Sequence, residues 1–293
     1  MSRLMWNGLL LSVIACVCAP AALLIAQDKD AEEKESDVKK FVRFLHGDEV
    51  TYGLVVEERV QQINGDIFGE WELTEHSFPL SDITLLTPTE PLHVFAMAGN
   101  YKSHLKDAEI PEKFKIPQPF FKSTSSLAPH GSAIVIPEGA EDVHFEAELV
   151  LVIGKECRDV SEEDALSYLF GVTCGNDISE RIWQKSDVQW WRAKGSDTFG
   201  PCGPYLVTGV DPDKLQMRLK LNDKVLQEEN TDHFIHDSAK MISFISKHVT
   251  LLPGDMIFTG TPGKTSAMKA GDVVEVEIEG VGTLRNTVVK EGE

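Results

Sequence analysis

The chain has 293 residues, of which 42% are hydrophobic and 26% are charged, a balance typical of a globular protein with a sizeable core in one or two domains. Asp and Glu number 47 against 28 Lys and Arg, which gives a formal net charge of −19. A nucleic-acid-binding protein is therefore not expected, because no cluster of cations is available to neutralise phosphates. An anionic substrate would need Lys or Arg side chains gathered in its own pocket.

The N-terminal residues differ in composition from the rest of the chain. Residues 1–26 contain a minimal basic start at Arg3, an apolar stretch and then small residues up to Ala26. This pattern predicts a cleaved secretory signal peptide and an exported, periplasmic or extracellular, protein. Two alternatives stay open: the stretch is nearly long enough to be a membrane anchor, and residues 13–16 resemble a bacterial lipoprotein box. Residues 27–38 are predicted to be a charged linker.

Three cysteines remain if the leader is removed. An odd number without short pairings predicts neither a disulfide framework nor a zinc site. We expect them to be small buried side chains. They are Cys157, Cys174 and Cys202.

Residues 39–88 read as a small all-β domain, because short apolar runs alternate with turn residues at 46–48 and 64–66. The Pro-rich segment 87–91 marks the boundary to a larger domain, 89–293. This domain starts with a buried strand over 94–98.

His104 and Asp107 follow this strand, three residues apart. If the segment is helical, the two side chains share a face, and a carboxylate beside an imidazole orients it for acid/base chemistry. The alternative is a surface histidine near a surface aspartate. The charged segment 107–118 is a plausible mobile loop that could cover a site. Lys122, at the end of the next predicted strand, is either solvated or a cation of the pocket.

Residues 144–149 alternate apolar and polar side chains and lead into a fully apolar run, which predicts a strand entering the core. Glu146 and Glu148 would share a face of this strand, about 6.5–7 Å apart along it, so both could bind one ion. Asp177 supplies a third acid after a predicted helix. Three carboxylates suit Mg²⁺, Mn²⁺ or Ca²⁺ better than zinc.

Alternating acids occur a second time, so this spacing alone does not establish a metal site. The second set is Glu275, Glu277 and Glu279. That segment is most simply a half-buried strand with a solvated acidic face. The apolar run after Glu148 and the third acid favour a metal site at the first strand only.

Helical and loop segments carry further candidate groups. Residues 161–170 begin like a capping box and predict a helix. Arg181 and Gln184 follow at helical spacing, and residues 190–201 read as a loop rich in aromatic and charged side chains. Arg181 and Lys194 could hold a carboxylate.

Five motifs occur in one order along the chain. They are Gly-Asn-Tyr-x-x-His at 99–104, Phe-Glu-Ala-Glu-Leu at 145–149, Asn-Asp-Ile-Ser-Glu-Arg at 176–181, Lys-Gly-Ser-Asp-Thr-Phe-Gly-Pro at 194–201, and Thr-Gly-Thr-Pro at 259–262. In this order they resemble the fumarylacetoacetate hydrolase (FAH) superfamily over residues 40–290. The resemblance implies a mixed, β-rich α+β fold: a β-roll catalytic domain preceded by a small all-β domain.

The resemblance also implies roles for single residues. Glu146, Glu148 and Asp177 match the metal ligands, His104 matches the general base, and Lys194 matches a lysine near the developing oxyanion.

Other positions match groups that contact the substrate. Arg181 and Gln184 match substrate-contacting residues, and Thr261 matches a threonine near the substrate carboxylate. Asp107 departs from the glutamate that many members place three residues after the histidine. That leaves open whether the site hydrolyses, decarboxylates or isomerises.

The resemblance implies a homodimeric, divalent-metal-dependent enzyme that acts on a small 2-oxo or 2-hydroxydienoate acid. The reactions open to it are C–C bond hydrolysis of acylpyruvates, decarboxylation of 2-oxo diacids, and isomerisation. Two alternatives remain: a cupin-like metal oxygenase, for which a His-x-His motif is missing, and an exported protein that binds a metal and a 2-oxo acid without turnover.

Overall fold

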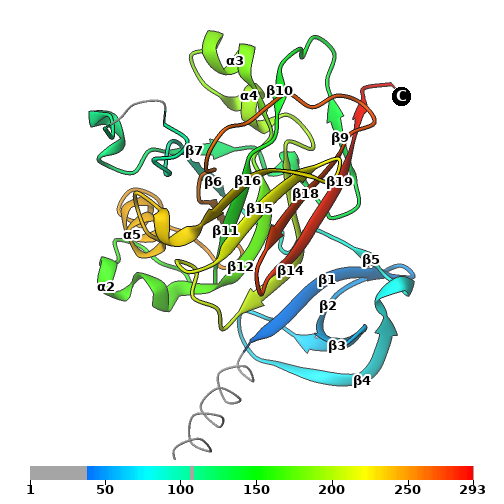
Figure 1. The fold of residues 1–293 in the computed structure, drawn as a ribbon. Coiled ribbons are helices and arrows are strands. Elements are labelled where there is room, and N and C mark those ends of the chain that lie inside the picture. Colours follow the sequence, from blue (N-terminus) through cyan, green and yellow to red (C-terminus); the bar gives the residue numbers. More distant parts are fainter. Residues whose placement is uncertain (1–37, 106–108, 293) are drawn as a thin grey trace, which may run out of the picture. The chain divides into compact units, whose positions relative to one another are not determined.

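The structure, a computed structural model, describes residues 38–105 and 109–292. A twelve-stranded sheet dominates these residues, with the strand order β4-β3-β2-β1-β14-β12-β11-β17-β6-β7, while β5 pairs with β1 and β8 with β14. Figure 1 shows its long central strands, β11, β12 and β14, side by side. The strands are β1 Lys39–His46, β2 Glu49–Val56, β3 Arg59–Gly65, β4 Trp71–Pro79, β5 Thr84–Leu85, β6 Val94–Met97, β7 Pro119–Lys122, β8 Leu127–Ala128, β11 Ala147–Ile153, β12 Leu169–Asn176, β14 Gly200–Thr208 and β17 Met256–Phe258.

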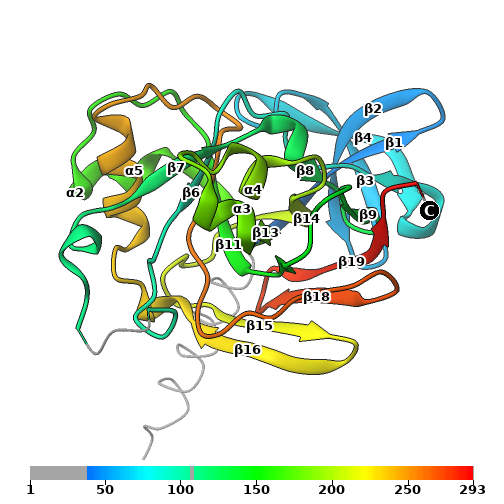
Figure 2. The same ribbon diagram turned by 90° about the horizontal axis from the view of Figure 1, so that it is seen from above.

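A five-stranded sheet of order β16-β15-β18-β19-β9 packs over the central strands of the large sheet (Figures 1 and 2). Apolar residues at every second position of its strands face the core, so their side chains meet those of β11. A separate pair, β10 and β13, lies beside the start of β11. These strands are β9 Ala133–Ile136, β10 Val143–His144, β13 Ser179–Glu180, β15 Gln216–Leu221, β16 Lys224–Asn230, β18 Val273–Ile278 and β19 Gly282–Lys290.

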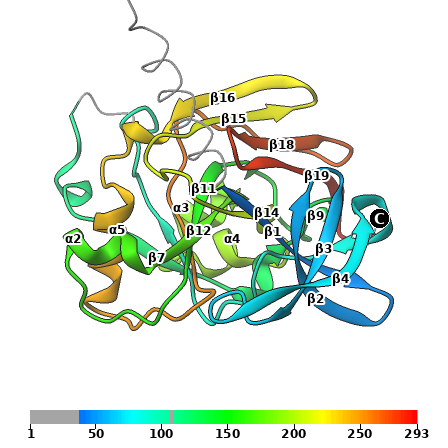
Figure 3. The same ribbon diagram turned by 90° about the horizontal axis from the view of Figure 1, so that it is seen from below.

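The N-terminal strands β1 to β5 form the small β segment that the sequence indicates at 39–88. They are not set apart from the larger part, because β1 pairs with β14, with Lys39 opposite Thr208. Figure 3 shows this continuity from below. Phe41 of β1 packs in one apolar cluster with Val150 and Val152 of β11. The segment thus covers the face of β11 that the five-stranded sheet leaves open.

Among the described residues, helices are few and short. The predicted helix over 161–170 is wrong in length, since α2 ends at Ala165, a 3₁₀ turn follows and β12 already begins at Leu169. The predicted loop over 190–201 contains a helix and the first residues of β14. The helices are α2 Glu162–Ala165, α3 Arg181–Ser186, α4 Trp191–Gly195 and α5 Ser238–Ser246, and the 3₁₀ turns are η1 Leu80–Asp82, η2 Glu112–Phe114, η3 Thr124–Ser126, η4 Leu166–Tyr168 and η5 Thr231–His233.

Two sets of predictions lie at the edges of what the structure covers. The signal peptide or anchor at 1–26, and the linker at 27–38 except for Val38, lie outside the described residues, as does Asp107. Within the described ranges, no helix is long and apolar enough to cross a membrane. The three cysteines predicted to be buried are buried and free: Cys157, Cys174 and Cys202.

Candidate metal centre

Glu148 is the second residue of β11, a strand whose seven residues are all buried, and Glu146 directly precedes this strand. The prediction of one continuous strand over 144–149 is wrong, because β10 ends at His144 and β11 begins at Ala147. In the break, the backbone N–H of Glu146 donates to Asn176 Oδ1 at 2.8 Å, in place of a strand partner. Both glutamates are nevertheless buried, with 3% and 1% of each residue's surface exposed.

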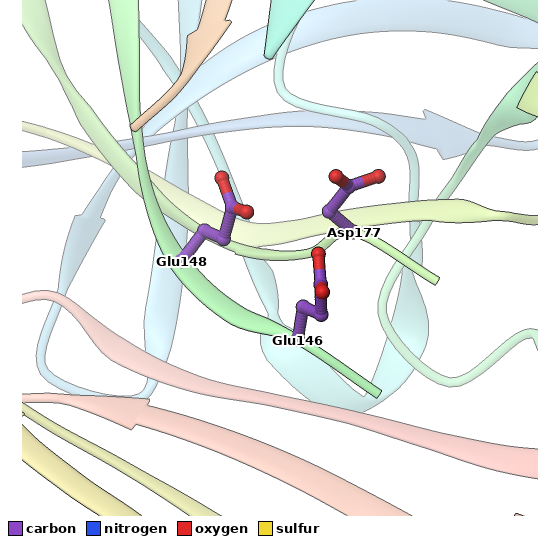
Figure 4. Close-up of side chains that lie close together, drawn as sticks. All are labelled: Glu146, Glu148 and Asp177. Carbon is purple, nitrogen blue, oxygen red and sulfur yellow. The ribbon is translucent and has the colours of Figure 1, made fainter. Parts of the chain in front are cut away.

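Asp177 completes a group of three carboxylates. It directly follows β12, which pairs antiparallel with β11, and its backbone N–H donates to the carbonyl oxygen of Glu146 at 2.9 Å. One oxygen from each of Glu146, Glu148 and Asp177 lies within 4.8 Å of the others, and Figure 4 shows the three side chains gathered in one place. Adjacent strands of the large sheet therefore bring together the three acids that the sequence singles out.

Two buried lysines hold Glu146 and Asp177. Lys194 of α4 donates to Glu146 Oε2 at 2.5 Å and to Asp177 Oδ2 at 2.6 Å. Lys122 of β7 donates to Asp177 Oδ1 at 2.6 Å, to the carbonyl oxygen of Phe199 at 3.2 Å and to the carbonyl oxygen of Lys194. An ammonium has three N–H donors, and those of Lys122 are all taken. Its fully buried side chain supports Asp177 and is absent from the pocket lining, so no donor remains for the substrate contact that the sequence suggests.

The three carboxylates are unequally compensated. Burial would raise the pKa of Glu146, but Lys194 and Arg181 outweigh it and hold this pKa well below its usual range. Glu148 has no ammonium or guanidinium within ion-pair distance in the described ranges, and it accepts only the backbone N–H of Gly260, at 2.7 Å. Burial, with Asp177 and Glu146 beside it, raises the pKa of Glu148 well above its usual range.

The donor set fits a hard divalent cation. Carboxylate oxygens are the ligands that Mg²⁺, Mn²⁺ and Ca²⁺ prefer, and an ion held by three of them leaves positions for substrate. A buried carboxylate without a cation is costly, because water no longer stabilises its charge. A divalent ion would supply the positive charge that Glu148 lacks, so the residues present fit the group that they were predicted to bind.

Gly260 can approach Glu148 only because it is glycine. Its φ of +99° lies in a region that residues with a side chain rarely adopt. A Cβ atom at Gly260 would lie 2.8 Å from Cβ of Asn100. The Thr-Gly-Thr-Pro motif therefore contributes a close backbone donor to the carboxylate cluster, as its glycine suggests.

A cavity of about 330 Å³ opens beside the carboxylates. Six of the predicted site residues line it, together with apolar side chains. The polar lining is His104, Glu146, Arg181, Gln184, Lys194 and Thr261, and the remaining lining is Met97, Ala98, Gly99, Leu105, Phe114, Phe120 and Trp190.

Arg181 is the first residue of α3, and its guanidinium reaches across to the carboxylates. Its Nη2 donates to Glu146 Oε1 at 2.5 Å and to Thr265 Oγ1 at 2.8 Å, while Nη1 donates to Gln184 Oε1 at 2.8 Å. The buried Glu180 caps this helix by accepting the backbone N–H of Trp183 at 2.5 Å. Arg181 and Gln184 share a face of the helix, as their spacing of three predicts.

His104 faces Glu146 across the pocket. Its Nδ1 lies 2.8 Å from the carbonyl oxygen of Gly263, and its Nε2 lies 4.0 Å from Glu146 Oε1. A carbonyl can only accept, so Nδ1 carries the proton and Nε2 keeps its lone pair. The imidazole is thus oriented by a backbone group, while its predicted partner Asp107 lies outside the described residues.

Thr261 is held by a residue that the sequence interpretation missed. Gln227 of β16 donates from Nε2 to Thr261 Oγ1 at 3.0 Å, and its Oε1 accepts the backbone N–H of Ala147 at 3.0 Å. Gln227 is buried and so ties the Thr-Gly-Thr-Pro segment to the first residue of β11. Its neighbours Glu228 and Glu229 give it the appearance of a surface residue, so the sequence carries no signal for this role.

Together, the fold and the site define a β-roll protein with a buried carboxylate centre beside a polar cavity. The chain belongs to the fumarylacetoacetate hydrolase family: residues 93–289 match the family described as Fumarylacetoacetate (FAA) hydrolase C-terminal, and residues 39–88 match the one described as Rv2993c-like, N-terminal. The β-rich fold class with its small N-terminal β segment is confirmed. A cupin-like oxygenase is accordingly the wrong class.

Similar proteins include enzymes of several activities. The crystal structure of 2-hydroxyhepta-2,4-diene-1,7-dioate isomerase from Mycobacterium marinum superimposes with a TM-score of 0.80 at 39% identity, over 87% of this chain and 100% of that one. Oxaloacetate tautomerase from Xenopus laevis is 39% identical over 73% of this chain and 71% of its own.

A third similar protein was solved with a metal ion. Maleylpyruvate hydrolase from Sphingobium in complex with manganese(II) ion and pyruvate superimposes with a TM-score of 0.72 at 28% identity, over 86% of this chain and 99% of that one. The chain is therefore a family enzyme, and a binding protein without turnover is not supported.

Proposed function

We propose that this protein is a divalent-metal-dependent enzyme that moves a proton on a small 2-oxo acid, as a tautomerase or isomerase. One observation carries the proposal. Of the described side chains that line the cavity, His104 alone can accept a proton without giving up a contact between a carboxylate and a cation. A single base is sufficient to move a proton between two nearby positions of the same molecule, such as the oxygen and the α carbon of an enol.

Glu146, Glu148 and Asp177 would hold Mg²⁺ or Mn²⁺, with Ca²⁺ also compatible with the donor set. When bound, such an ion acts as a Lewis acid that polarises the 2-oxo oxygen of the substrate. Lys122 has a positioning role in this proposal, because it fixes one oxygen of Asp177 from behind.

His104 performs the proton transfer. Its Nε2 takes the proton from the enol oxygen, or from the carbon bonded to the carbonyl carbon, and returns one at the other end of this three-atom unit, so substrate and product are isomers and no co-reactant is needed. The carbonyl oxygen of Gly263 keeps the ring in one tautomer throughout. With 26% of its side chain exposed, His104 can reach a bound molecule.

Three residues provide donors for the substrate carboxylate and the developing charge. Lys194 uses two of its three N–H donors on carboxylates, and Arg181 uses three of its five, so both keep donors for the ligand. Thr261 accepts from Gln227, so its own hydroxyl hydrogen is available to the ligand. These donors are held in place before the substrate arrives, which makes them effective for charge stabilisation.

C–C bond hydrolysis of an acylpyruvate is the second candidate. It is favoured by the exposure of His104, because a base reached by water can also activate it, and by the hydrolase among the similar structures. Decarboxylation of a 2-oxo diacid, export and a homodimer stay predictions from the sequence.

The experiment uses the purified chain with Mg²⁺ or Mn²⁺ and the enol forms of oxaloacetate and of acylpyruvates. Loss of the enol absorbance reports tautomerisation, and NMR of the products separates it from C–C cleavage. We expect accelerated ketonisation without cleavage. Cleavage products would favour the second candidate, and the absence of turnover on every 2-oxo acid tested would overturn both.

His104→Asn tests the assignment of the base. We expect kcat to fall by about 10²- to 10⁴-fold, as is typical when a general base is removed, with Mn²⁺ affinity by calorimetry unchanged. His233→Asn is the matched control, because His233 lies on η5 with 64% of its side chain exposed. Normal turnover by His104→Asn would show that the base is another group.

A further inference from the structure

A chain of hydrogen bonds runs from the surface to Arg181 without passing through the carboxylate centre. Asp142 Oδ1 lies 2.8 Å from His144 Nε2, and His144 Nδ1 lies 2.8 Å from Thr265 Oγ1. Thr265 Oγ1 in turn accepts from Arg181 Nη2 at 2.8 Å. None of these three supporting residues lines the cavity.

For a neutral His144, the donor count sets the direction of every bond in the chain. A guanidinium only donates, so Thr265 must accept from Arg181 and keeps its single hydroxyl hydrogen for His144 Nδ1. His144 then carries its proton on Nε2 and donates it to Asp142. Each donor meets one acceptor, and the chain has one consistent arrangement.

The backbone holds both ends of the chain against α3. Arg181 N–H donates to the carbonyl oxygen of Asp142 at 2.9 Å. Glu180 Oε1 accepts the backbone N–H of Asp142 at 2.9 Å, and β10 pairs with β13, which places His144 opposite Ser179. The chain is therefore anchored on the same short segment from which Arg181 leaves.

We propose that Asp142, His144 and Thr265 form a positioning relay that sets the orientation of the Arg181 guanidinium at the wall of the substrate pocket. The inference rests on the proposed function, in which Arg181 binds the substrate carboxylate. These residues do not line the cavity, so in this proposal they act through Arg181 alone.

The relay has a specific task because Glu146 competes for the same nitrogen. Nη2 of Arg181 is shared between Glu146 Oε1, at 2.5 Å, and Thr265 Oγ1. Without an acceptor at Thr265, Gln184 alone holds the guanidinium against the attraction of the carboxylate, and we expect the donors left for the substrate to turn away. The relay thereby separates a cation that binds substrate from a carboxylate that would bind metal.

Thr265→Val tests the relay, since it keeps the shape of the side chain and removes the acceptor. We expect KM for the 2-oxo acid to rise by about five- to tenfold and kcat to stay within about twofold, because the lost interaction serves binding rather than the proton transfer. Thr265→Ser, which restores the hydroxyl, should return KM to the wild-type value. Thr84→Val, on the exposed strand β5, is the matched control and should change neither constant.

A double-mutant cycle separates a relay from a general structural effect. In an Arg181→Ala background, Thr265→Val should have no further effect on KM, because the residue through which it acts is gone. An unchanged KM in the single variant, or the same loss in both backgrounds, would overturn the relay.

Oxalate affinity by calorimetry, in the presence of Mg²⁺, keeps the test independent of turnover. Oxalate presents two neighbouring oxygen groups, as does the enolate of a 2-oxo acid. Suppose that no 2-oxo acid is turned over, but that Thr265→Val weakens oxalate binding about fivefold or more in protein that retains Arg181 and not in Arg181→Ala. The proposed reaction then fails and the relay stands. Equal oxalate affinity in wild type and Thr265→Val would overturn the relay, whatever the enzyme catalyses.

Discussion

Alternating glutamates occur at two strands of this protein, β18 and β11, and the two sets differ in exposure and in ionic partners. On β18, Glu277 is 40% exposed at its side chain and pairs with Lys220 at 2.8 Å, while Glu275 lies 3.3 Å from Arg285. At the start of β11, Glu148 is 1% exposed and has only a backbone N–H as a partner. The same spacing of acids therefore gives a solvated charged face in one strand and a candidate ion site in the other.

The number of covered faces explains the difference. β18 alternates buried and half-buried residues, because only one face of its sheet meets the core. β11 is covered on both faces: Leu149 and Leu151 pack in the main core, whereas Val150 and Val152 pack in the cluster that includes the N-terminal strands. An acid on a strand covered on both faces has no water, so its ionised form requires a cation from the protein or from solution.

The largest expected effect comes from removing the one acid that lacks a cation. Glu148→Gln should lower kcat/KM by at least about 1,000-fold, since a bound ion supplies several kcal/mol of charge stabilisation and about 1.4 kcal/mol corresponds to a factor of ten. Glu277→Gln makes the same change on the solvated strand and should stay within about twofold. Steady-state kinetics on a responsive 2-oxo acid measures both.

The same pair of variants can be compared by thermal unfolding. Mn²⁺ at about 100 times its Kd should stabilise the wild type and Glu277→Gln by about 2.7 kcal/mol, but not Glu148→Gln. In metal-free buffer, Glu148→Gln should be no less stable than wild type, because it removes a buried carboxylate without an ionic partner. Equal stabilisation of both variants by Mn²⁺ would remove the distinction between the strands.

The lysines that contact the two sets of acids give the next comparison. Lys122→Met removes one of the two buried ammonium groups that hold Asp177, and it leaves two backbone carbonyls without their donor. Breaking a buried pair typically costs about 3–5 kcal/mol. Lys220→Met removes the partner of Glu277, a pair whose two side chains are partly exposed. We expect it to lower the urea midpoint by less than about a third of the decrease that Lys122→Met causes. Urea unfolding of metal-free protein measures both, and equal losses would mean that burial does not separate the two pairs.

Local patterns predicted part of this site, and distance along the chain explains the rest. The alternation around Glu146 and Glu148 indicated convergent acids without a structure, even though the strand is broken between His144 and Ala147. The alternation did not predict the break, because the side chain of Asn176 replaces a strand partner at that point. Such a contact joins positions 30 residues apart, and no local pattern encodes it.

The supporting residues were missed for the same reason. Thr265 and Gln227 look like surface residues in sequence, yet they bind Arg181 and Thr261 across 84 and 34 residues. Lys122 was considered as a pocket cation, but β7 places its ammonium behind Asp177. The fold class followed from the order of five motifs, whereas the roles of single cations depend on which side of a carboxylate they approach.

The smallest expected effect is the salt dependence of the Lys220→Met variant on the solvated strand. At about 1 M NaCl the screening length falls to about 3 Å, so exposed pairs lose most of their attraction while buried pairs keep theirs. The small difference in urea midpoint between wild type and Lys220→Met should therefore disappear at this salt concentration, but the difference for Lys122→Met should persist. A difference for Lys220→Met that survived high salt would show that Glu277 is shielded from solvent, and burial would no longer explain why only one of the two strands forms a site.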